Sequence, residues 1–432
     1  MQTKFLTIII PILLIVLAGC KKEDGVILQV NIQQMTFDFE GNPSSEINLT
    51  ISGNTDWIVF SDKDWCEPDI HKGSGDKKIT LSVGKNALFS EREATITIMA
   101  VSSSLSRLVS IKQNGSSLDV AAQIPDDNFR AYCLANFDSN KDGKLSLVET
   151  ETVQVIEVPN KNILSLEGIA YFGRLHSLNC SNIPTGWENE WTPIYENPNI
   201  IASLDLSENT ELEELDCSAL SIKANNLALN ISQNTQLKKL ICFSNRLWAL
   251  DVSPFSELEY LDCHLASIAS LDLSRNRKLK TVICGQNPNM ATLDLTLCPD
   301  LMRLDCFANS LRDLNLSANK KLIDLNCGAN HLSGIDLSLN TELKRLDLSV
   351  NLMSSVDLSY NLKLEELYCS GRFYELDISA NRSLKVLDCP RAFWLTTIYV
   401  WDDFDFETPS NSIPSISIPE YGASFALKPK NV

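Results

Sequence analysis

The sequence predicts a mainly β protein: an N-terminal β-sandwich, a short helical cap, and a solenoid with parallel strands on both faces. Between positions 26 and 113, short stretches of alternating apolar and polar residues are separated by clusters of Gly, Asn, Pro and Ser, as in a sandwich of short strands. From residue 153 to about residue 400, a pattern of about 21 residues repeats. A fixed period of this length is typical of a solenoid.

Each period of the repeat has two similar halves. One has the form LxxLxC, as at Leu258–Cys263, and the other has the form LxxLDLSxN, with Ile268 in the first place and Asn276 in the last. The two-residue alternation in each half predicts a short strand that points Leu261 and Cys263 inward. No half repeat buries its apolar residues alone, so neighbouring coils must stack into one continuous core.

The repeat resembles bacterial leucine-rich repeats over residues 153–400, and specifically the nested-period subclass called IRREKO repeats. Ordinary leucine-rich repeats carry a strand on one face and a helix or loop on the other. Here both halves match a strand, so the resemblance implies a flattened coil with two strand faces. The Asn residues of the turns are expected to adopt left-handed backbone and to stack as a ladder of hydrogen bonds.

Cysteine recurs at one inward position of the repeat, and Leu348 replaces it in one row. A position that accepts Leu is an apolar packing position, so we interpret these cysteines as buried free thiols. Their side chains are expected to point in parallel directions, which disfavours bridges between rows. A disulfide ladder or a metal ladder is the alternative. The row cysteines are Cys242, Cys263, Cys284, Cys306, Cys327, Cys369 and Cys389; Cys66, Cys133 and Cys298 fall outside the pattern.

Residues 1–20 have the form of a lipoprotein signal peptide. One Lys precedes an apolar run that is too short for a spanning helix and ends in the letters LAGC at Cys20. These letters resemble the bacterial lipobox, which implies that Cys20 is acylated and anchors the chain in lipid. The linker 21–26 begins KKED, and its acidic pair resembles the surface-export signal of Bacteroidetes-type lipoproteins. We therefore expect an outer-membrane anchor with the protein facing the cell exterior.

Residues 27–115, the expected sandwich, carry the markers of a further family. Two Asp-Trp pairs, at Trp57 and Trp65, precede a Gly-x-Gly at Gly73 and an Arg-x-Ala at Arg92. These markers resemble the BACON domain, a family named for carbohydrate binding. We interpret Trp57 as a core residue. We interpret Trp65 as a core residue too, with contact to a ligand as the alternative that makes it a candidate binding residue. The whole domain could equally be a spacer.

Residues 138–149 match an EF-hand loop in every ligand position. Ca²⁺ takes six to eight oxygen ligands, and this spacing supplies them, with Gly143 at the sharp turn. Helices at Asp127–Phe137 and Leu147–Val153 are expected on either side. Because only one loop is present, we predict a structural calcium that locks a cap over residues 120–152. The expected calcium ligands are Asp138, Asn140, Asp142, Lys144 through its carbonyl, Ser146 and Glu149.

Two surfaces are candidates for binding a partner. An insertion of about 16 residues interrupts the first row, and its Trp187, Trp191 and Tyr195 either contact a ligand or fold back over the solenoid edge. The outward strand positions on the cysteine side form a broad polar face. Its candidate contact residues are Tyr260, Arg303, Arg345 and Tyr368. Residues 401–432 are expected to form a C-terminal cap whose aromatic side chains seal the last coil.

The composition limits the function. A net charge of −18 and a pI near 4.7 disfavour nucleic acid as a partner. The four His lack metal-ligand spacing, and no nucleophile elbow or phosphate loop occurs. The sequence therefore predicts a non-enzymatic surface lipoprotein that binds a protein partner through the repeat face, for adhesion or docking. The alternative is a glycan-binding accessory protein of a polysaccharide-uptake system; an enzyme is the least favoured reading.

Overall fold

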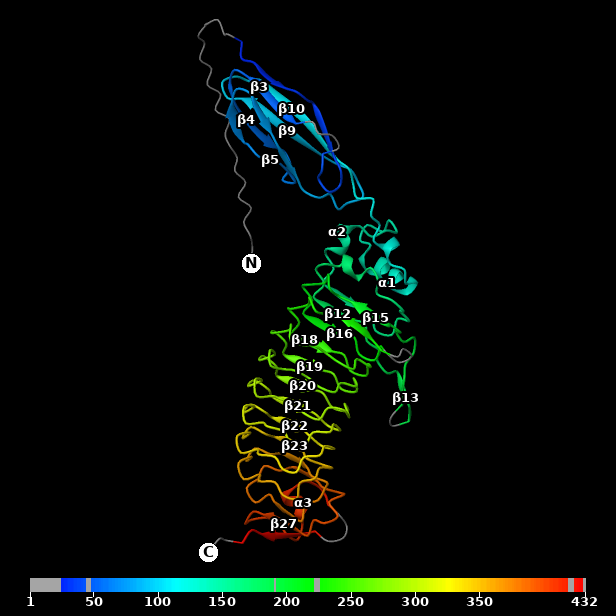
Figure 1. Cartoon of the computed structure of the whole chain (residues 1–432), viewed down its shortest axis with the longest axis vertical. Helices are drawn as coiled ribbons and strands as arrows, with labels where there is room; N and C mark the ends of the chain where they lie inside the picture. The colour runs from blue at the N-terminus through cyan, green and yellow to red at the C-terminus, as the bar shows by residue number, and fades with distance from the viewer. Residues whose placement is uncertain (1–24, 44–47, 190–191, 221–225, 419–422, 430–432) are drawn as a thin grey trace. The chain divides into compact units, whose positions relative to one another are not determined.

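The computed structural model describes residues 25–43, 48–189, 192–220, 226–418 and 423–429. The chain divides into two compact units, Met1–Ser117 and Leu118–Val432, which are described separately (Figure 1). Within the described ranges, no helix is both long enough and apolar enough to cross a membrane.

The described part of the first unit is made of short strands in three sheets. The order in the largest sheet is β2-β10-β9-β4-β6, a second sheet has the order β1-β3-β7, and β5 pairs with β8. The strands are β1 (Leu28–Val30), β2 (Gln34–Phe37), β3 (Leu49–Gly53), β4 (Asp56–Ser61), β5 (Cys66–Pro68), β6 (Lys72–Ser74), β7 (Lys77–Ile79), β8 (Leu81–Val83), β9 (Arg92–Ala100) and β10 (Ser106–Gln113).

Trp57 on β4 lies at the centre of the core of this unit. Its side chain is fully buried, and its indole Nε1 donates a hydrogen bond to the carbonyl of Gly75 at 3.0 Å. A Cβ on Gly73 would lie only 2.5 Å from the Trp57 ring, so the ring requires glycine on the neighbouring strand β6. Trp57 is therefore a packing residue, as its place in the sequence indicated.

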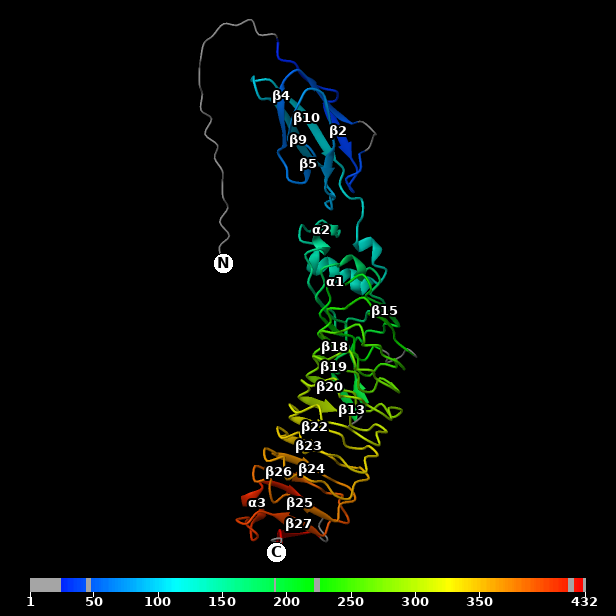
Figure 2. The same ribbon diagram turned by 60° about the vertical axis from the view of Figure 1, so that its left-hand side comes forward.

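The second unit is a solenoid whose cysteine side forms one sheet of twelve strands, each parallel to its neighbours. Its coils follow one another along the stack from green to red (Figure 2). The sheet consists of β11 (Val155–Glu157), β12 (Ser177–Asn179), β16 (Glu214–Asp216), β18 (Lys239–Ile241), β19 (Tyr260–Asp262), β20 (Thr281–Ile283), β21 (Arg303–Asp305), β22 (Asp324–Asn326), β23 (Arg345–Asp347), β24 (Glu366–Tyr368), β26 (Val386–Asp388) and β28 (Ser415–Ser417). Equivalent residues pair across every row, so the inward Leu, Ile or Val of each strand lies on its equivalent in the next coil. The prediction of a mainly β, parallel-strand repeat solenoid is confirmed.

On the Asp-Leu-Ser side, the strands found among the described residues lie at the two ends of the solenoid. They are β15 (Ser203–Asp205) with β17 (Ala228–Asn230), and β25 (Glu375–Asp377) with β27 (Thr397–Val400) and β29 (Ser424–Leu427). In the described middle rows, the segments bond locally instead: Asp272 Oδ1 accepts a hydrogen bond from Ser274 N at 2.9 Å. A second strand face along the whole length is thus replaced there by turns.

Buried asparagines join successive coils on both sides. On the cysteine side, Asn287 Oδ1 accepts from Ala266 N and Ile268 N, while its Nδ2 donates to the carbonyls of Cys263 and Cys284. Asparagines on the other side donate to carbonyls of the preceding coil. That second ladder contains Asn209, Asn234, Asn276, Asn319, Asn340, Asn361 and Asn381. The asparagine ladder expected from the sequence therefore exists twice.

We expected the turn asparagines on the cysteine side to adopt left-handed backbone. In the structure, the left-handed residue instead precedes the position that the asparagine usually occupies. In the six rows from Cys242 to Leu348, the residue two places after the row cysteine, or after Leu348, has a φ between 53° and 58°. The asparagine keeps a negative φ because its side chain must point inward to reach two coils. The left-handed column is Ser244, Leu265, Gln286, Ala308, Ala329 and Val350.

Both ends of the solenoid are capped. At the front, α1 (Asp127–Phe137) is N-capped by Asp126, whose Oδ1 accepts from Phe129 N at 2.8 Å, and α2 (Leu147–Thr150) is a single turn. At the back, Trp401 and Phe404 are buried against each other with ring centroids 5.4 Å apart. One hydrophobic core runs from Val120 to Ile413. The remaining helical segments are η1 (Ala121–Gln123), η2 (Ile169–Tyr171) and α3 (Pro409–Ser412).

Replacing Val350 by glycine is expected to stabilise the protein. Val350 has a φ of 58° and is 59% exposed, so it contributes little burial while its branched Cβ is strained. Relief of this strain outweighs the added chain entropy of glycine, giving a gain of about 1 kcal/mol. Urea unfolding of Val350→Gly measures the gain. Val350→Ala, which keeps the Cβ, is the control and should gain much less; a loss of stability in Val350→Gly would contradict the strain argument.

Candidate functional site

The loop at residues 138–149 places its polar side chains by hydrogen bonds to its own backbone. Asp138 accepts from Asp142 N at 3.2 Å and from Gly143 N at 2.9 Å. Asn140 Oδ1 accepts from the same Asp142 N at 2.9 Å. Gly143 has a φ of 78°, the left-handed geometry expected at the sharp turn. These bonds draw the oxygens of Asp138 and Asn140 toward the same stretch of backbone.

Glu149 closes the loop from the first turn of α2. Its carboxylate is 7% exposed and accepts from the N and Oγ atoms of both Ser139 and Ser146, each at 2.9 Å. Burial opposes its charge, but these hydrogen bonds prevail and lower the pKa of Glu149. The side chain is therefore a buried, ionised oxygen donor at the mouth of the loop.

The donor set of the loop fits a hard cation such as Ca²⁺. In the described part of the chain, no group of three or more His, Cys, Asp and Glu side chains is arranged to hold a metal ion. An EF-hand-like site does not depend on such a group alone. It draws in addition on the Asn140 amide oxygen, the Lys144 carbonyl and the Ser146 hydroxyl.

The loop is attached to the cap by a contact that sequence reasoning missed. Val120 N donates to the Leu145 carbonyl at 2.9 Å, and Leu145 N donates to Asp119 Oδ1 at 3.1 Å. Leu145 is fully buried in the core of the solenoid unit. The segment before η1 thus pairs with the loop. Asp119 and Leu145 are 26 residues apart in the sequence, so no local sequence pattern predicts this pairing.

The insertion in the first row folds into a β-hairpin. Strand β13 (Gly186–Asn189) pairs antiparallel with β14 (Thr192–Ile194), and the hairpin extends away from the coils (Figure 1). Trp187 is 60% exposed, whereas Tyr195 is partly buried and burial raises its pKa. Trp191 lies outside the described residues. Of the two expectations for this insertion, the exposed Trp187 favours contact with a partner over covering of the solenoid edge.

Trp65 is partly buried and packs against the core of the first unit, the role that we favoured for it over contact with a ligand. The guanidinium of Arg92 lies 4.2 Å from the centroid of the Trp65 ring. Arg92 is held there by hydrogen bonds to the Gly84 carbonyl at 2.7 Å and to Gln113 Oε1 at 2.8 Å. One face of the indole is therefore covered by a fixed cation, which leaves only its edge and other face for a partner.

The polar face of the twelve-stranded sheet brings three of its four candidate residues together. Arg345 Nη1 lies 3.3 Å from Asp324, which also pairs with Arg303 at 3.5 Å. The Arg345 guanidinium lies 4.9 Å from the centroid of the Tyr368 ring. Tyr260 stands apart from this group, with Lys239 Nζ 6.0 Å from its ring centroid. The face thus carries a linked Arg and Tyr patch on β21 to β24.

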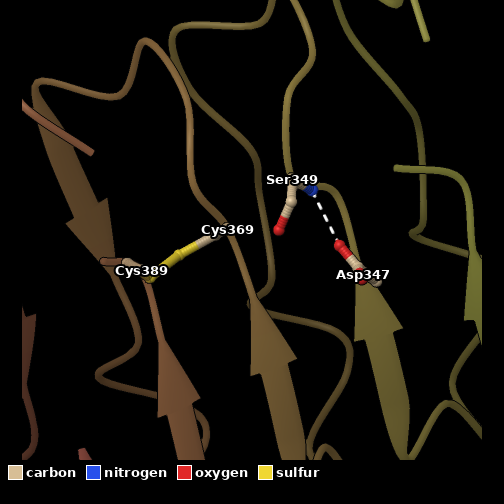
Figure 3. Close-up of a disulfide and its surroundings, with 4 residues drawn as sticks. All are labelled: Asp347, Ser349, Cys369 and Cys389. Atoms are coloured by element: carbon tan, nitrogen blue, oxygen red, sulfur yellow. Dashed lines mark hydrogen bonds between the residues drawn. A yellow bond between two sulfur atoms is a disulfide. The ribbon is translucent and has the colours of Figure 1, made fainter. Parts of the chain in front are cut away.

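The cysteines form a buried ladder that ends in a disulfide. Ten described cysteines are free and buried, and burial raises the pKa of Cys284 to about 12. Cys298 falls outside the cysteine pattern of the rows. In the structure it takes the place of an asparagine in the second ladder, with its Sγ 3.7 Å from the Asn276 carbonyl oxygen. The expectation of free thiols is wrong for Cys369 and Cys389, which form a disulfide beside the Asp347 turn (Figure 3). Their Cα atoms are 4.9 Å apart, within bridging range, and parallel Cβ directions do not prevent rotation about χ1 from joining the sulfurs.

Comparisons with known proteins agree with this architecture. Residues 55–114 match the BACON family model, described as "Putative binding domain, N-terminal". The functional domain of InlJ from Listeria monocytogenes, which includes a cysteine ladder, is 26% identical; the match covers 72% of this chain and 77% of that one, with a TM-score of 0.50. An internalin, inlF, from the same organism is 17% identical, with 72% and 99% covered and a TM-score of 0.45. A search of curated protein sequences found no match.

The fold and these matches define the class of protein. The chain combines a BACON-type binding domain with an internalin-like leucine-rich-repeat solenoid, and both parts indicate a binding role. The cysteine ladder is shared with the InlJ domain. In the described residues of this chain, its free thiols are enclosed in the core, so they contribute packing and no accessible chemistry.

The free cysteines are expected to resist modification in the folded protein. Burial excludes reagents and keeps the thiolate population low at pH 8, because it raises the thiol pKa. With the protein lacking residues 1–20, Ellman's reagent should label almost no thiol in the native state. In guanidinium it should label ten, and after reduction twelve, which adds the two disulfide cysteines to the ten free ones. Rapid labelling of several thiols in the native protein would contradict a closed ladder.

Proposed function

We propose that this protein is a non-enzymatic surface lipoprotein that binds a protein partner through the cysteine-side sheet of its solenoid. The observation that carries the proposal is the sheet itself. Its twelve parallel strands expose a continuous row of outward side chains, while the inward Leu and Cys positions maintain the core. Catalysis lacks support in the sequence, since the His residues lack metal-ligand spacing and no nucleophile elbow or phosphate loop occurs.

The linked patch at Arg303, Arg345 and Tyr368 is the proposed centre of the binding face. Arginine and tyrosine are the residue types that dominate protein–protein hot spots, because they combine a large contact area with directed hydrogen bonds. The ion pairs of Arg345 with Asp324 and Glu366, at 3.3 and 3.4 Å, fix the guanidinium in place. A partner would therefore meet an ordered patch and lose less side-chain entropy on binding.

A retention experiment tests this face. The protein lacking residues 1–20, immobilised, is expected to retain a protein partner from host or cell-surface extracts. The double variant Arg345→Ala and Tyr368→Ala should weaken retention at least tenfold, because hot-spot truncations cost about 2 kcal/mol or more. The control, Lys63→Ala in the first unit, should retain the partner as the unchanged protein does. Equal retention by the double variant would refute this binding face.

We further propose that the loop at residues 138–149 binds a structural calcium ion. Asp138, Asn140, Asp142, the Lys144 carbonyl, Ser146 and Glu149 are the proposed ligands. Coordination would exchange part of the serine hydrogen bonds of Glu149 for bonds to the metal. Because Leu145 and its pairing with Val120 tie the loop to the core, a bound cation would stiffen the cap that covers the first coil.

Removal of calcium is expected to lower the melting temperature. EDTA should destabilise the unchanged protein, and excess Ca²⁺ should restore it, while Asp138→Ala should abolish the response. The response should persist from about pH 7 to about pH 5 and disappear as pH falls through the lowered pKa of Glu149, because a protonated carboxyl no longer binds the cation. Differential scanning fluorimetry gives the comparison. Identical melting curves with EDTA and with Ca²⁺ would rule the site out.

For the N-terminus, we propose anchoring in outer-membrane lipid through acylated Cys20, with the protein facing outward. The support is the sequence of residues 1–24 alone, which lie outside the described residues. Cys20→Ser is expected to move the protein from the membrane fraction to the soluble fraction and to end labelling by a palmitate analogue. Protease treatment of intact cells tests orientation, since only a protein facing outward is digested. Palmitate labelling that survives in Cys20→Ser would exclude this anchor.

A glycan-binding role in polysaccharide uptake is the second candidate function, and one observation favours it. Trp187 projects from the β13–β14 hairpin with 60% of its surface exposed, as a stacking platform for a sugar ring would require. Different variants of the protein distinguish the two proposed functions. Loss of binding on deletion of residues 184–198 indicates a glycan or other hairpin ligand, whereas loss on substitution of Arg345 and Tyr368 indicates the sheet face.

A further inference from the structure

One position of the twelve-stranded sheet follows a pattern that repeats every two rows, whereas the repeat itself has a period of one row. At the third position of successive strands, aspartate alternates with another residue over nine rows. In strand order the residues are Asp216, Ile241, Asp262, Ile283, Asp305, Asn326, Asp347, Tyr368 and Asp388, each paired with the next across the sheet. The outward face therefore presents carboxylates in every second coil, with apolar, aromatic or amide side chains between them.

The carboxylates of this column are positioned by the turns that follow the strands. Asp347 Oδ1 accepts from Ser349 N at 2.9 Å (Figure 3). Asp305 Oδ1 accepts from Phe307 N at 3.1 Å in the equivalent turn. Both side chains are half-buried. Asp262 differs, because it is only 7% exposed and lies 2.6 Å from His264 Nδ1. The accessible run of the column is thus Asp305, Asp347 and Asp388.

Neighbouring charges on the sheet are already balanced, and this column is the exception. Lys238 pairs with Glu213 and Lys280 with Glu259, both at 2.6 Å. Arg345 is shared between Asp324 and Glu366. Among the ion pairs found between described residues, none uses Asp305, Asp347 or Asp388. These three carboxylates thus lack a direct ion pair, although Asp347 lies in the field of Arg345 and Asp305 accepts from Asn326 Nδ2 at 3.3 Å. A complementary partner supplies cations at the same spacing.

The spacing selects the conformation of that partner. Strands lie about 4.7–4.9 Å apart, so two rows separate the carboxylates by roughly 9.4–9.8 Å. A polyproline II helix rises about 9.3 Å in three residues. A β-strand advances about 6.8 Å in two residues, and an α-helix advances about 10.5 Å in seven. Between Asp305 and Asp388, the spacing of cations on an α-helix would differ from the spacing of the carboxylates by roughly 2 Å. On a polyproline II helix, the difference would stay within about 1 Å.

We propose that the cysteine-side sheet binds a basic polyproline II segment of a protein, laid across the strands, with Lys or Arg at every third residue. Its cations lie over Asp305, Asp347 and Asp388. The residues between the cations contact Asn326 and Tyr368, since aromatic side chains are the usual support for proline rings. This inference deepens the proposed function and rests on it, because it names the chemistry of the partner.

Fluorescence anisotropy with labelled peptides tests the inference on residues 21–432. The probe is (Pro-Pro-Arg)₅. One control is (Pro-Pro-Pro-Arg)₅, with equal charge and a longer spacing; the other is (Gly-Ser-Arg)₅, with equal spacing and no polyproline II preference. The probe is expected to bind at least tenfold more tightly than either control. Asp305→Asn, Asp347→Asn and Asp388→Asn should each weaken it several-fold. Asn keeps an acceptor for the turn, so the fold is preserved, and Asp272→Asn on the opposite side is the matched control.

The outcomes separate this inference from the proposed function. Equal affinity for all three peptides, or affinity unchanged by the three substitutions, overturns the inference, because binding would then follow net charge alone. If no peptide binds, yet the retained protein partner is lost on substitution of Arg345 and Tyr368, the inference falls and the proposed function stands. If the peptides bind as expected but retention of the protein partner does not depend on Arg345 and Tyr368, the sheet does bind basic polyproline II segments. The proposed binding patch at Arg345 and Tyr368 is then wrong.

Discussion

The stacking of one coil on the next is the interaction on which the rest of this structure depends. A strand of three residues has no stability alone, and it persists here because Leu and Cys meet their equivalents in the neighbouring coils. Asparagine side chains complete the stacking by bonding the turn backbone of two coils at once. Since each coil requires neighbours on both sides, the helical cap and the aromatic seal at the ends follow from the same constraint.

This constraint also explains where the protein is free to acquire function. Inward positions are restricted to residues that pack, so cysteine there is enclosed and carries no accessible chemistry. Outward positions lie outside the packed core and accept charge, aromatic rings or amides. Two coils can therefore have different surfaces while their cores are equivalent. This is why aspartate can occur in every second coil although the core pattern repeats in every coil. The exposed hairpin uses the same freedom at a turn.

Some features depend on contacts between residues distant in sequence, and they could not be predicted from local patterns. The pairing of Leu145 with Val120 and the cover of Arg92 over Trp65 are of this kind. The disulfide is another, because the equivalent cysteines of the other rows gave no reason to single out Cys369 and Cys389. Trp187 was one of two open alternatives, since a sequence gives the length of an insertion but not its direction.

The sequence by itself determined the solenoid, its period and the inward residues, because each rests on local spacing. It also indicated the core role of Trp57. Only the tertiary structure decided that described strands on the Asp-Leu-Ser side are confined to the ends and that aspartates line up in every second row. It also decided that the residue before five of the cysteine-side asparagines is left-handed. These properties depend on the register between coils, and register is set by packing across the stack, which no single repeat contains.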